Sequence, residues 1–219
     1  MRKITGRLFG GTCFLCRGAA SALLCDACTA DLPRLAPPRC PRCALESPRG
    51  AVCGRCLAEM PHYDETVAAL AYRFPADALV QALKFRGELA VAAAFGALLL
   101  PKIAPLEVDC VIPVPLSAER LKSRGFNHAA EIARELAPAK LELGLCVRRR
   151  DTAPQMDLPF AERRRNVRGA FQCKRMLSGA RVAVVDDVMT TGATLDEVAS
   201  VLKSAGAARV VNWVVTRTL

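Results

Sequence analysis

The chain has 219 residues, of which 52% are hydrophobic, and it carries a formal net charge of +10 at pH 7. This length suits one large domain with a small appendage, and the apolar fraction is ample for a hydrophobic core. No apolar run approaches the roughly 18 residues of a membrane span, so we expect no membrane insertion and a cytoplasmic location. The positive charge favours polyanionic ligands or partners, which include both phosphate-rich substrates and nucleic acids.

Cysteine spacing dominates the first 62 residues. Eight of the 11 cysteines form four C-x-x-C pairs: Cys13/Cys16, Cys25/Cys28, Cys40/Cys43 and Cys53/Cys56. Four disulfides would not normally persist in a cytosolic chain, whereas two such pairs can complete a tetrahedral four-thiolate site, which suits Zn²⁺. The spacing permits consecutive pairing or an interleaved one, first pair with third and second with fourth. We expect residues 1–62 to form a small module that depends on structural zinc for its folding.

The role of this module is open at the level of sequence. A four-thiolate site leaves no coordination position for catalysis. The module could bind nucleic acid or a partner protein, or only support the domain that follows. The three remaining cysteines, Cys110, Cys146 and Cys173, stand alone in the sequence and are interpreted as ordinary core or surface thiols.

From residue 63 onward, strands and helices are predicted to alternate. An apolar run predicts a strand at 66–72. Pro75 then opens a helical stretch over 76–86, which Gly87 ends, with cationic side chains in its last turn as the helix dipole prefers. A second helix is predicted over 88–100, ended by Pro101.

The next strand is predicted at 108–112, and it leads directly into Pro113-Val114-Pro115. Two prolines around one residue fix the backbone at the carboxyl end of this strand. A helix over 117–136 follows, interrupted near Gly125. Its first half gathers positive charge close to the same edge of the sheet, through Arg120, Lys122 and Arg124.

A further strand is predicted at 146–149, and an arginine-rich segment follows it. Residues 148–168 hold seven arginines against three acids, and two prolines break any helix through the middle. Such a run is compatible with a solvated basic surface, but we interpret it as a mobile loop that closes over a multiply charged ligand. The closing strand is predicted at 209–216. The alternation of strands and helices predicts an α/β fold with a mostly parallel sheet.

Between these elements lies the stretch with the clearest chemical signal, RVAVVDDVMTTGAT at 181–194. Its apolar run, 182–185, is typical of a central strand buried on both faces. Asp186 and Asp187 follow where we expect that strand to end, and a loop of threonines and glycine then opens a helix through residue 205. Ligands of open α/β sheets bind beyond the carboxyl ends of the strands.

This loop has the features of a phosphate site. Its threonine hydroxyls, the close approach that Gly192 allows and the unpaired N–H groups of a helix start all favour an anion. The two carboxylates would repel a phosphate, so we expect them to face hydroxyl groups or a hydrated Mg²⁺. A phosphorylated ribose meets both requirements.

Three other interpretations were compared with this one. A P-loop nucleotide-binding protein would need G-x-x-x-x-G-K-[ST], and the chain contains no Gly-Lys dipeptide. A dinucleotide-binding fold would need G-x-G-x-x-G, which is also missing. An ordinary strand–turn–helix with an Asp or Thr cap is the remaining structural alternative.

The full string VVDDVMTTGAT resembles the phosphoribosyl-pyrophosphate (PRPP) motif of type I phosphoribosyltransferases. From about residue 13 to residue 216, the chain resembles the ComF family of competence-associated phosphoribosyltransferase-like proteins. The motifs that support this resemblance are the four C-x-x-C pairs, LKFRG, VIPVP, RGFNHA, TAPQ, ERRRNVRGAF and VVDDVMTTGAT. It implies a double zinc ribbon in residues 1–62 and an α/β type I phosphoribosyltransferase core in residues 63–219, with a mostly parallel sheet flanked by helices.

The resemblance also implies how the site is organised. The expected PRPP-binding residues are Val185, Asp186, Asp187, Thr190, Thr191, Gly192, Ala193 and Thr194. Pyrophosphate, with Mg²⁺, is expected against Pro113, Val114 and Pro115 and near Lys122 and Arg124. Catalytic roles are expected for Asp186 and Asp187 beside the sugar and for Arg163 and Arg164 in the closing segment.

The acceptor and the oligomeric state are not specified by these motifs. A hood over the acceptor is expected from residues near 62–90, where Lys84 and Arg86 are candidates. His128 is interpreted as a helix-surface residue and receives no role. The competing interpretation is a non-catalytic accessory protein that binds single-stranded DNA and contacts proteins of the competence machinery. The net charge allows it, but the low aromatic content of 5% gives few stacking platforms.

Overall fold

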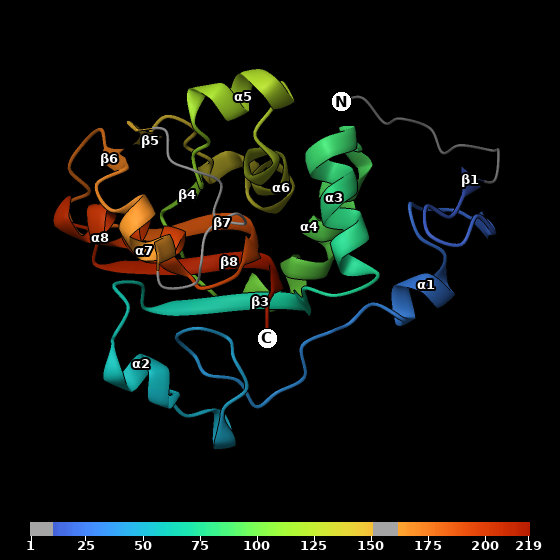
Figure 1. Cartoon of the computed structure of the whole chain (residues 1–219), viewed down its shortest axis with the longest axis horizontal. Helices are drawn as coiled ribbons and strands as arrows, with labels where there is room; N and C mark the ends of the chain where they lie inside the picture. The colour runs from blue at the N-terminus through green and yellow to red at the C-terminus, as the bar shows by residue number, and fades with distance from the viewer. Residues whose placement is uncertain (1–10, 151–161) are drawn as a thin grey trace.

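A four-stranded parallel sheet forms the centre of the computed structural model, which describes residues 11–150 and 162–219 (Figure 1). The strand order is β3-β8-β7-β4. The strands span Glu65–Ala71 (β3), Arg209–Arg217 (β8), Arg181–Met189 (β7) and Cys110–Pro113 (β4). The predicted α/β fold with a mostly parallel sheet flanked by helices is confirmed.

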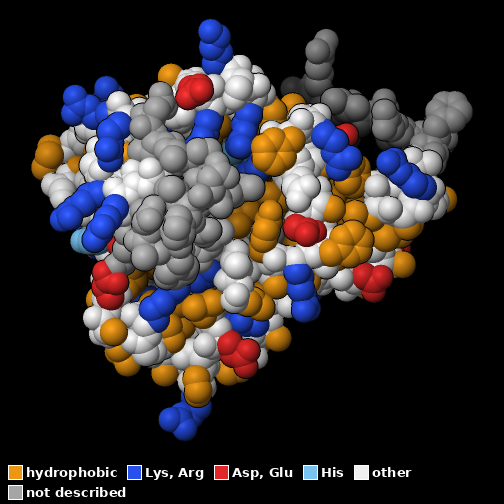
Figure 2. Space-filling model, viewed as in Figure 1, with side chains coloured by type: hydrophobic (Ala, Val, Ile, Leu, Met, Phe, Trp, Pro, Cys, Tyr) orange, Lys and Arg blue, Asp and Glu red, His pale blue; other side chains and the backbone are white. Residues whose placement is uncertain are grey.

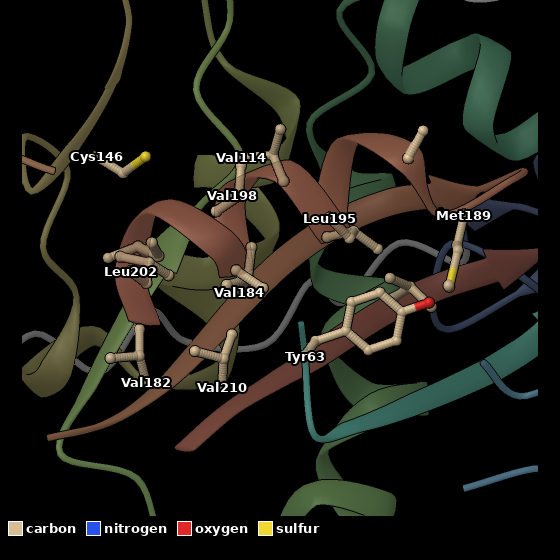
Figure 3. Close-up of a cluster of buried hydrophobic side chains, with 14 of the residues drawn as sticks. Tyr63, Val114, Cys146, Val182, Val184, Met189, Leu195, Val198, Leu202 and Val210 are labelled. Carbon is tan, nitrogen blue, oxygen red and sulfur yellow. The ribbon is translucent and has the colours of Figure 1, made fainter. Parts of the chain in front are cut away.

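Both faces of the sheet are covered because the two central strands are apolar on both sides. Alternate residues of β7 point to opposite faces, so that Ala183 and Val185 enter one core and Val182 and Val184 enter the other. The first core is closed by α3 (Ala76–Arg86), α4 (Ala90–Ile103) and α6 (His128–Leu136). The second is closed by α8 (Ala193–Ser204), whose Leu195, Val198 and Leu202 lie over β7 and β8 in Figure 3.

The two halves of the cysteine-rich segment pack against opposite faces of this sheet. The first half contributes Cys13, Leu24 and Leu32 to the core beneath α3 and α4. The second half contributes Cys40 and Cys43, among others, to the core beneath α8. Its short elements are β1 (Gly11–Thr12), β2 (Ala19–Ala20), α1 (Asp26–Ala30), the 3₁₀ turn η1 (Pro48–Gly50) and α2 (Gly54–Ala58).

The chain between the two halves runs alongside β3, the outermost strand of the sheet. The backbone N–H of Leu35 donates to the carbonyl of Ala69 at 3.1 Å, and the N–H of Ala71 donates to the carbonyl of Pro33 at 2.7 Å. Further along, the N–H of Thr66 donates to the carbonyl of Pro41 at 2.9 Å. The connecting segment therefore pairs with the outer side of β3.

Of two predicted helix boundaries, one needs correction and one is confirmed. Pro101 does not end the second helix, because α4 continues through it to Ile103. Pro101 removes one hydrogen bond of the helix, but the buried Leu99 and Ile103 hold the last turn against the core. The predicted interruption near Gly125 is present: α5 (Ala118–Arg124) ends there, and α6 begins at His128.

The segment after α6 departs most from the prediction. The 3₁₀ turn η2 (Pro138–Lys140) leads to β5 (Cys146–Arg148), which pairs antiparallel with β6 (Phe171–Cys173) in a separate two-stranded sheet. The arginine-rich segment is not a loop throughout, because α7 (Glu162–Val167) lies in it, beyond the two prolines that break helices. Within the described residues, no helix is both long enough and apolar enough to cross a bilayer.

Candidate functional site

Strand β7 is longer than predicted and includes both acidic residues. It remains paired with β8 as far as Met189, which lies opposite Arg217, so Asp186 and Asp187 belong to the strand and do not follow it. The acidic pair therefore has the fixed backbone geometry of a paired strand. The turn into α8 begins only at Thr190.

A small hollow of about 200 Å³ opens where β7 passes into α8. Its lining residues come from the end of the strand and the first turn of the helix: Asp186, Val188, Met189, Thr190, Gly192, Ala193, Thr194 and Leu195. An acidic residue, two threonines and the first residues of a helix thus line the same space. Val185 is fully buried in the strand behind it.

Gly192 is required at the turn for two reasons. It is the residue that precedes α8, with a φ of 85°, a conformation that favours glycine. A Cβ atom at this position would also lie 2.7 Å from Cε of Met189 and 3.1 Å from the hydroxyl of Tyr63. The hydroxyl of Thr191 accepts a hydrogen bond from the N–H of Ala193 at 3.1 Å, which shapes the same turn.

Asp187 is held differently from Asp186, although the two are adjacent. Its side chain is 3% exposed and forms a 2.6 Å ion pair with Nζ of Lys84 on α3. Its other carboxylate oxygen is 3.3 Å from Nε2 of His128, which begins α6. The three residues come from three different elements, so Asp187 ties the end of β7 to two helices of the covering layer.

His128 is itself oriented by Arg124, the last residue of α5. Nη1 of Arg124 lies 3.2 Å from Nδ1 of His128. Because an arginine can only donate, Nδ1 accepts, and Nε2 carries the proton that faces Asp187. The prediction that His128 is a helix-surface residue is wrong, since it is 4% exposed.

The different surroundings move the two carboxyl groups in opposite directions. Burial opposes ionisation of Asp187, but Lys84 and His128 outweigh it and hold the pKa of Asp187 below its usual range. Burial and the neighbouring charge of Asp187 raise the pKa of Asp186 well above its usual value. Asp186 is therefore the carboxylate that gains most from a cation or from hydroxyl donors of a ligand.

The end of β4 lies next to the acidic pair, as expected of parallel neighbours. Pro113 is opposite Val185 in register, and the N–H of Val114 donates to the carbonyl of Val185 at 2.9 Å. The carbonyl of Val114 accepts a 3.0 Å hydrogen bond from Asn127, which also caps α6. The turn that includes Pro115 thus lies beside the hollow.

Not every predicted site residue is brought to this edge. Lys122 is exposed on α5, whereas Arg124 is half-buried and contacts His128. Arg163 and Arg164 belong to α7, but their side chains lie outside what the structure describes, as do residues 152–155 of the TAPQ motif.

A second hollow, of about 890 Å³, lies between the carboxyl end of α3 and α5. It is lined by cationic and aromatic side chains together with Gly87 and Ser123: Lys84, Phe85, Arg86, Arg120, Arg124 and Phe126. The guanidinium of Arg124 stacks over the ring of Phe85, 5.1 Å from its centroid. Figure 2 shows Lys and Arg side chains gathered over the upper part of this face, over α5 and the β5–β6 sheet.

The eight paired cysteines form two clusters of four, and the consecutive pairing is the one observed. Within each cluster, the sulfur atoms all lie within 4.8 Å of one another: Cys13, Cys16, Cys25 and Cys28 in the first cluster, and Cys40, Cys43, Cys53 and Cys56 in the second. The interleaved alternative is wrong, because the two clusters lie on opposite faces of the sheet.

The geometry of both clusters fits a tetrahedral metal. Sγ of Cys16 lies 3.7 Å from Sγ of Cys25, and Sγ of Cys43 lies 3.6 Å from Sγ of Cys53. Four thiolates around Zn²⁺ would be separated by about 3.8 Å, given Zn–S bonds near 2.3 Å. The N–H of Cys53 also donates to Sγ of Cys40 at 3.3 Å, an interaction that favours a thiolate. Both clusters are therefore consistent with structural zinc.

Lys84 and His128 are the functional candidates that sequence reasoning underrated. His128, Ile132 and Leu136 are spaced four residues apart, and all three are buried on one stripe of α6. That spacing is a readable signal that His128 faces inward. Lys84 follows the buried Leu83 near the end of α3, and only the three-dimensional packing of α3 against β7 reveals its partner.

Two family models match this chain. Residues 4–57 match the double zinc ribbon domain, and residues 121–217 match the phosphoribosyl transferase domain. The first match includes all eight clustered cysteines. The second includes Asp186, Asp187 and the loop that lines the hollow beyond β7.

Relatives of similar length match nearly the whole chain. It is 34% identical over 224 residues to DNA utilization protein YhgH of Salmonella typhi, which covers 95% of this chain and 98% of that protein. It is 30% identical over 227 residues to competence protein F of Haemophilus influenzae, with the same coverage. A solved purine phosphoribosyltransferase from Pyrococcus horikoshii matches 57% of this chain and 80% of its own, at 20% identity and a TM-score of 0.37.

Proposed function

Because the chain belongs to the family of competence protein F and DNA utilization protein YhgH, we propose that it is a phosphoribosyltransferase that acts in the uptake or use of DNA. Its substrate is PRPP, bound together with Mg²⁺, and an acceptor not yet identified receives the phosphoribosyl group. The observation that supports this proposal best is the hollow beyond β7, where the carboxylate of Asp186 and a threonine-glycine turn at a helix start face the same space.

Each part of that hollow suits one part of a sugar phosphate. The 5′-phosphate would lie at residues 190–194, where hydroxyls and helix-start N–H groups favour an anion. The ribose hydroxyls would lie at Asp186, whose high pKa reflects burial and an adjacent negative charge. Asp187 would act mainly through its partners, because its oxygens are already engaged by Lys84 and His128.

The residues also fit a divalent cation at the pyrophosphate side. Carboxylate oxygens such as those of Asp186 are the hard donors that Mg²⁺ prefers. Bound there with pyrophosphate, Mg²⁺ would neutralise charge on the leaving group. The turn 113–115 and Arg124 would hold that group in place, and Asp186 would stabilise the positive charge that develops on the sugar. Arg163 and Arg164 are proposed to help exclude water during this step.

Calorimetric titration with PRPP and Mg²⁺ tests the site. We expect binding by the wild-type chain and a loss of about tenfold or more in affinity for Asp186→Asn, because a charge-assisted contact is removed. Asp109→Asn is the matched control, since Asp109 is exposed at the opposite end of the sheet beside Arg181. Equal affinities of wild type and Asp186→Asn would overturn the proposed site.

Transfer is tested by measuring pyrophosphate release against a panel of nucleobases, nucleotides and oligonucleotides. Release that depends on one class of acceptor, and that Asp186→Asn abolishes, supports an enzyme. Binding of PRPP without release for any acceptor contradicts the transferase proposal.

One observation favours a second candidate function, that of a non-catalytic protein that binds single-stranded DNA. The hollow between α3 and α5 combines four cations with Phe85 and Phe126, which is the chemistry that tracks phosphates and stacks bases. This function predicts oligonucleotide binding that weakens steeply as salt rises. It also predicts that Phe85→Ala weakens this binding while pyrophosphate release stays absent in every condition.

A further inference from the structure

Arg217, the last residue of β8, is a buried cation whose described contacts are to backbone carbonyls. It is 1% exposed, yet its guanidinium lies in the core between the second cysteine cluster and the turn after β7. Burying a charge is costly unless hydrogen bonds compensate it. An apolar side chain could fill this position at a lower cost in free energy. The presence of a hydrogen-bonded arginine here therefore needs an explanation.

Those hydrogen bonds join two parts of the chain that are far apart in sequence. Nε of Arg217 donates to the carbonyl of Cys43 at 2.8 Å. Nη1 donates to the carbonyl of Met189 at 2.9 Å and also to the carbonyl of Thr190. One rigid, planar group therefore connects a cysteine of the second cluster to the last residue of β7 and to the first residue of the turn that follows it.

This contact fixes the orientation of a peptide plane. In a trans peptide, the carbonyl of one residue and the N–H of the next point in opposite directions. With the Thr190 carbonyl held by Arg217, the N–H of Thr191 points away from the guanidinium. The direction of this one backbone donor of the turn is thus preset before any ligand arrives, which favours anion binding.

A second link runs parallel to the first. Arg42, between the cysteines of the Cys40/Cys43 pair, donates to the carbonyl of Tyr63 at 2.7 Å. The side chain of Tyr63 lies beside Met189 in Figure 3, and its hydroxyl would lie 3.1 Å from a Cβ atom at Gly192. The same cysteine pair therefore supports the turn through Tyr63 as well as through Arg217.

The first cluster is placed differently. It packs against the opposite face of the sheet, where Phe14 lies under the guanidinium of Arg86 at 5.3 Å. Its neighbours are α3 and α4, and the turn at 190–194 lies on the other side of β7 and β8.

We propose that the second four-cysteine cluster is a working part of the anion-binding turn, and that Arg217 is the positioning residue that couples them. The proposal rests on the proposed function, because it assumes that the turn binds the phosphate of PRPP. Metal held by the second cluster fixes the Cys43 carbonyl, Arg217 transmits that position to Thr190, and the turn keeps its donors in place. Metal in the first cluster has no comparable effect on the turn.

The direct test replaces Arg217 by methionine, which fills the space and removes the donors. Hydrogen–deuterium exchange of the full chain measures how fast the backbone amides of the turn exchange, without any ligand. We expect Arg217→Met to exchange at least about tenfold faster over residues 189–194, with the first cluster unchanged and both metals retained. Arg209→Met is the matched control on the same strand, because Arg209 is exposed at the far end of β8 and pairs with Glu65.

Unchanged exchange at 189–194 in Arg217→Met would overturn the proposal, whatever the chain binds. PRPP titration adds a second readout: Arg217→Met should bind at least about tenfold more weakly, and Arg217→Lys should recover part of that loss. A wild-type chain that binds no PRPP contradicts the proposed function alone, since the exchange result still decides the coupling.

The clusters are then compared through Cys56→Ser in the second and Cys28→Ser in the first, with metal content measured in each. We expect Cys56→Ser to accelerate exchange at 189–194 far more than Cys28→Ser does. Equal acceleration by both variants would show that metal loss acts through general stability and would overturn the coupling. If Cys56→Ser fails to fold, the comparison of Arg217→Met with Arg209→Met decides the question with both clusters intact.

Discussion

At the scale of single residues, Asp186 and Asp187 have different roles. Asp187 is an internal anchor, ionised and paired with Lys84 and His128. Asp186 faces the hollow, and the charge of its neighbour makes its own ionisation unfavourable. The two carboxylates lie in one cluster with His128, within 4.8 Å of one another, and Asp187 takes the ion pair with Lys84.

These different roles predict opposite effects on stability at neutral pH. Asp187→Asn leaves the partly buried Lys84 without its ion-pair partner and should cost about 3 kcal/mol of unfolding free energy. Asp186→Asn removes a repulsion and should raise the midpoint of thermal unfolding while it weakens PRPP binding. Urea and thermal unfolding of both variants measure this, with Asp109→Asn as the surface control. A stabilised Asp187→Asn would contradict the anchor role.

The pH dependence follows from the same two groups. The folded-state pKa of Asp187 is lowered, so its stabilisation is complete above the unfolded value and is lost as pH falls through the folded pKa. The folded-state pKa of Asp186 is raised, so its ionisation costs stability as pH rises above the unfolded value. In Asp187→Asn, we expect the free energy of unfolding to fall less steeply than in the wild type as pH is lowered. In Asp186→Asn, we expect it to fall less steeply than in the wild type as pH rises above the unfolded-state pKa.

Residue-level prediction from sequence worked where the signal was a contiguous motif. The acidic pair and the threonine-glycine turn are neighbours in the chain, so one stretch identified the hollow. Lys84, His128 and Arg217 reach their partners across long sequence separations, and no local pattern encodes those contacts. For His128, the sequence does contain a signal, which is its four-residue spacing with Ile132 and Leu136 on α6.

At the scale of elements, the turn between β7 and α8 depends on one glycine. Gly192 and Gly179 have nearly the same backbone conformation, with φ of 85° and 84°. A Cβ atom would meet Met189 and Tyr63 at Gly192 but nothing within 4 Å at Gly179. A comparison of substitutions at these two glycines therefore separates the cost of backbone strain from the cost of crowding.

Alanine at these two glycines should therefore have unequal effects. Gly179→Ala carries only the cost of an unfavourable φ, on the order of 1 kcal/mol. Gly192→Ala adds contacts with the flexible end of Met189 and with the hydroxyl of Tyr63, which should cost no more than about 1 kcal/mol in addition, and it should also weaken PRPP binding. Unfolding free energies and calorimetric titration of the two variants test this. Equal losses in both measurements would mean that crowding at the turn is unimportant.

Element prediction succeeded for segments with strong periodicity and failed where tertiary contacts decide. The strands of the main sheet and the break before α6 followed from apolar runs and glycine. The extension of β7 to Met189 could not be read from its sequence, because pairing with β8 sustains it through two acidic residues. The separate β5–β6 sheet depends on the pairing of residues 146–148 with residues 171–173, which are distant in the sequence.

At the scale of the whole molecule, the two cysteine clusters hold opposite faces of one sheet. The order of the cysteine pairs in the sequence does not predict this arrangement. Long-range packing decides which face of the sheet each half of the cysteine-rich segment covers. Each cluster buries part of its own half in a core shared with the sheet. The two cysteine clusters are thus integral to both layers of the fold.

Removal of zinc should therefore loosen residues 11–60 first. Structural zinc contributes about 10–16 kcal/mol of folding free energy in small metal-dependent modules, so the cysteine-rich halves should not remain ordered without it. Limited proteolysis after chelation, read by mass spectrometry, should cut within 11–60 much faster, and added Zn²⁺ should restore resistance. Unchanged cleavage after verified metal loss would contradict a structural role for the metal.

The pairing of residues 33–35 and 41 with β3 has a practical consequence for anyone who shortens this protein. A recombinant fragment that begins at residue 63 would lose three backbone hydrogen bonds to β3, involving Leu35, Ala71 and Thr66. Its outer strand would then present unpaired N–H and C=O groups to other molecules, and such open edges promote aggregation. The fragment from residue 63 onward is expected to self-associate when expressed alone, which light scattering would detect. The cysteine-rich segment therefore also protects this edge of the sheet from aggregation.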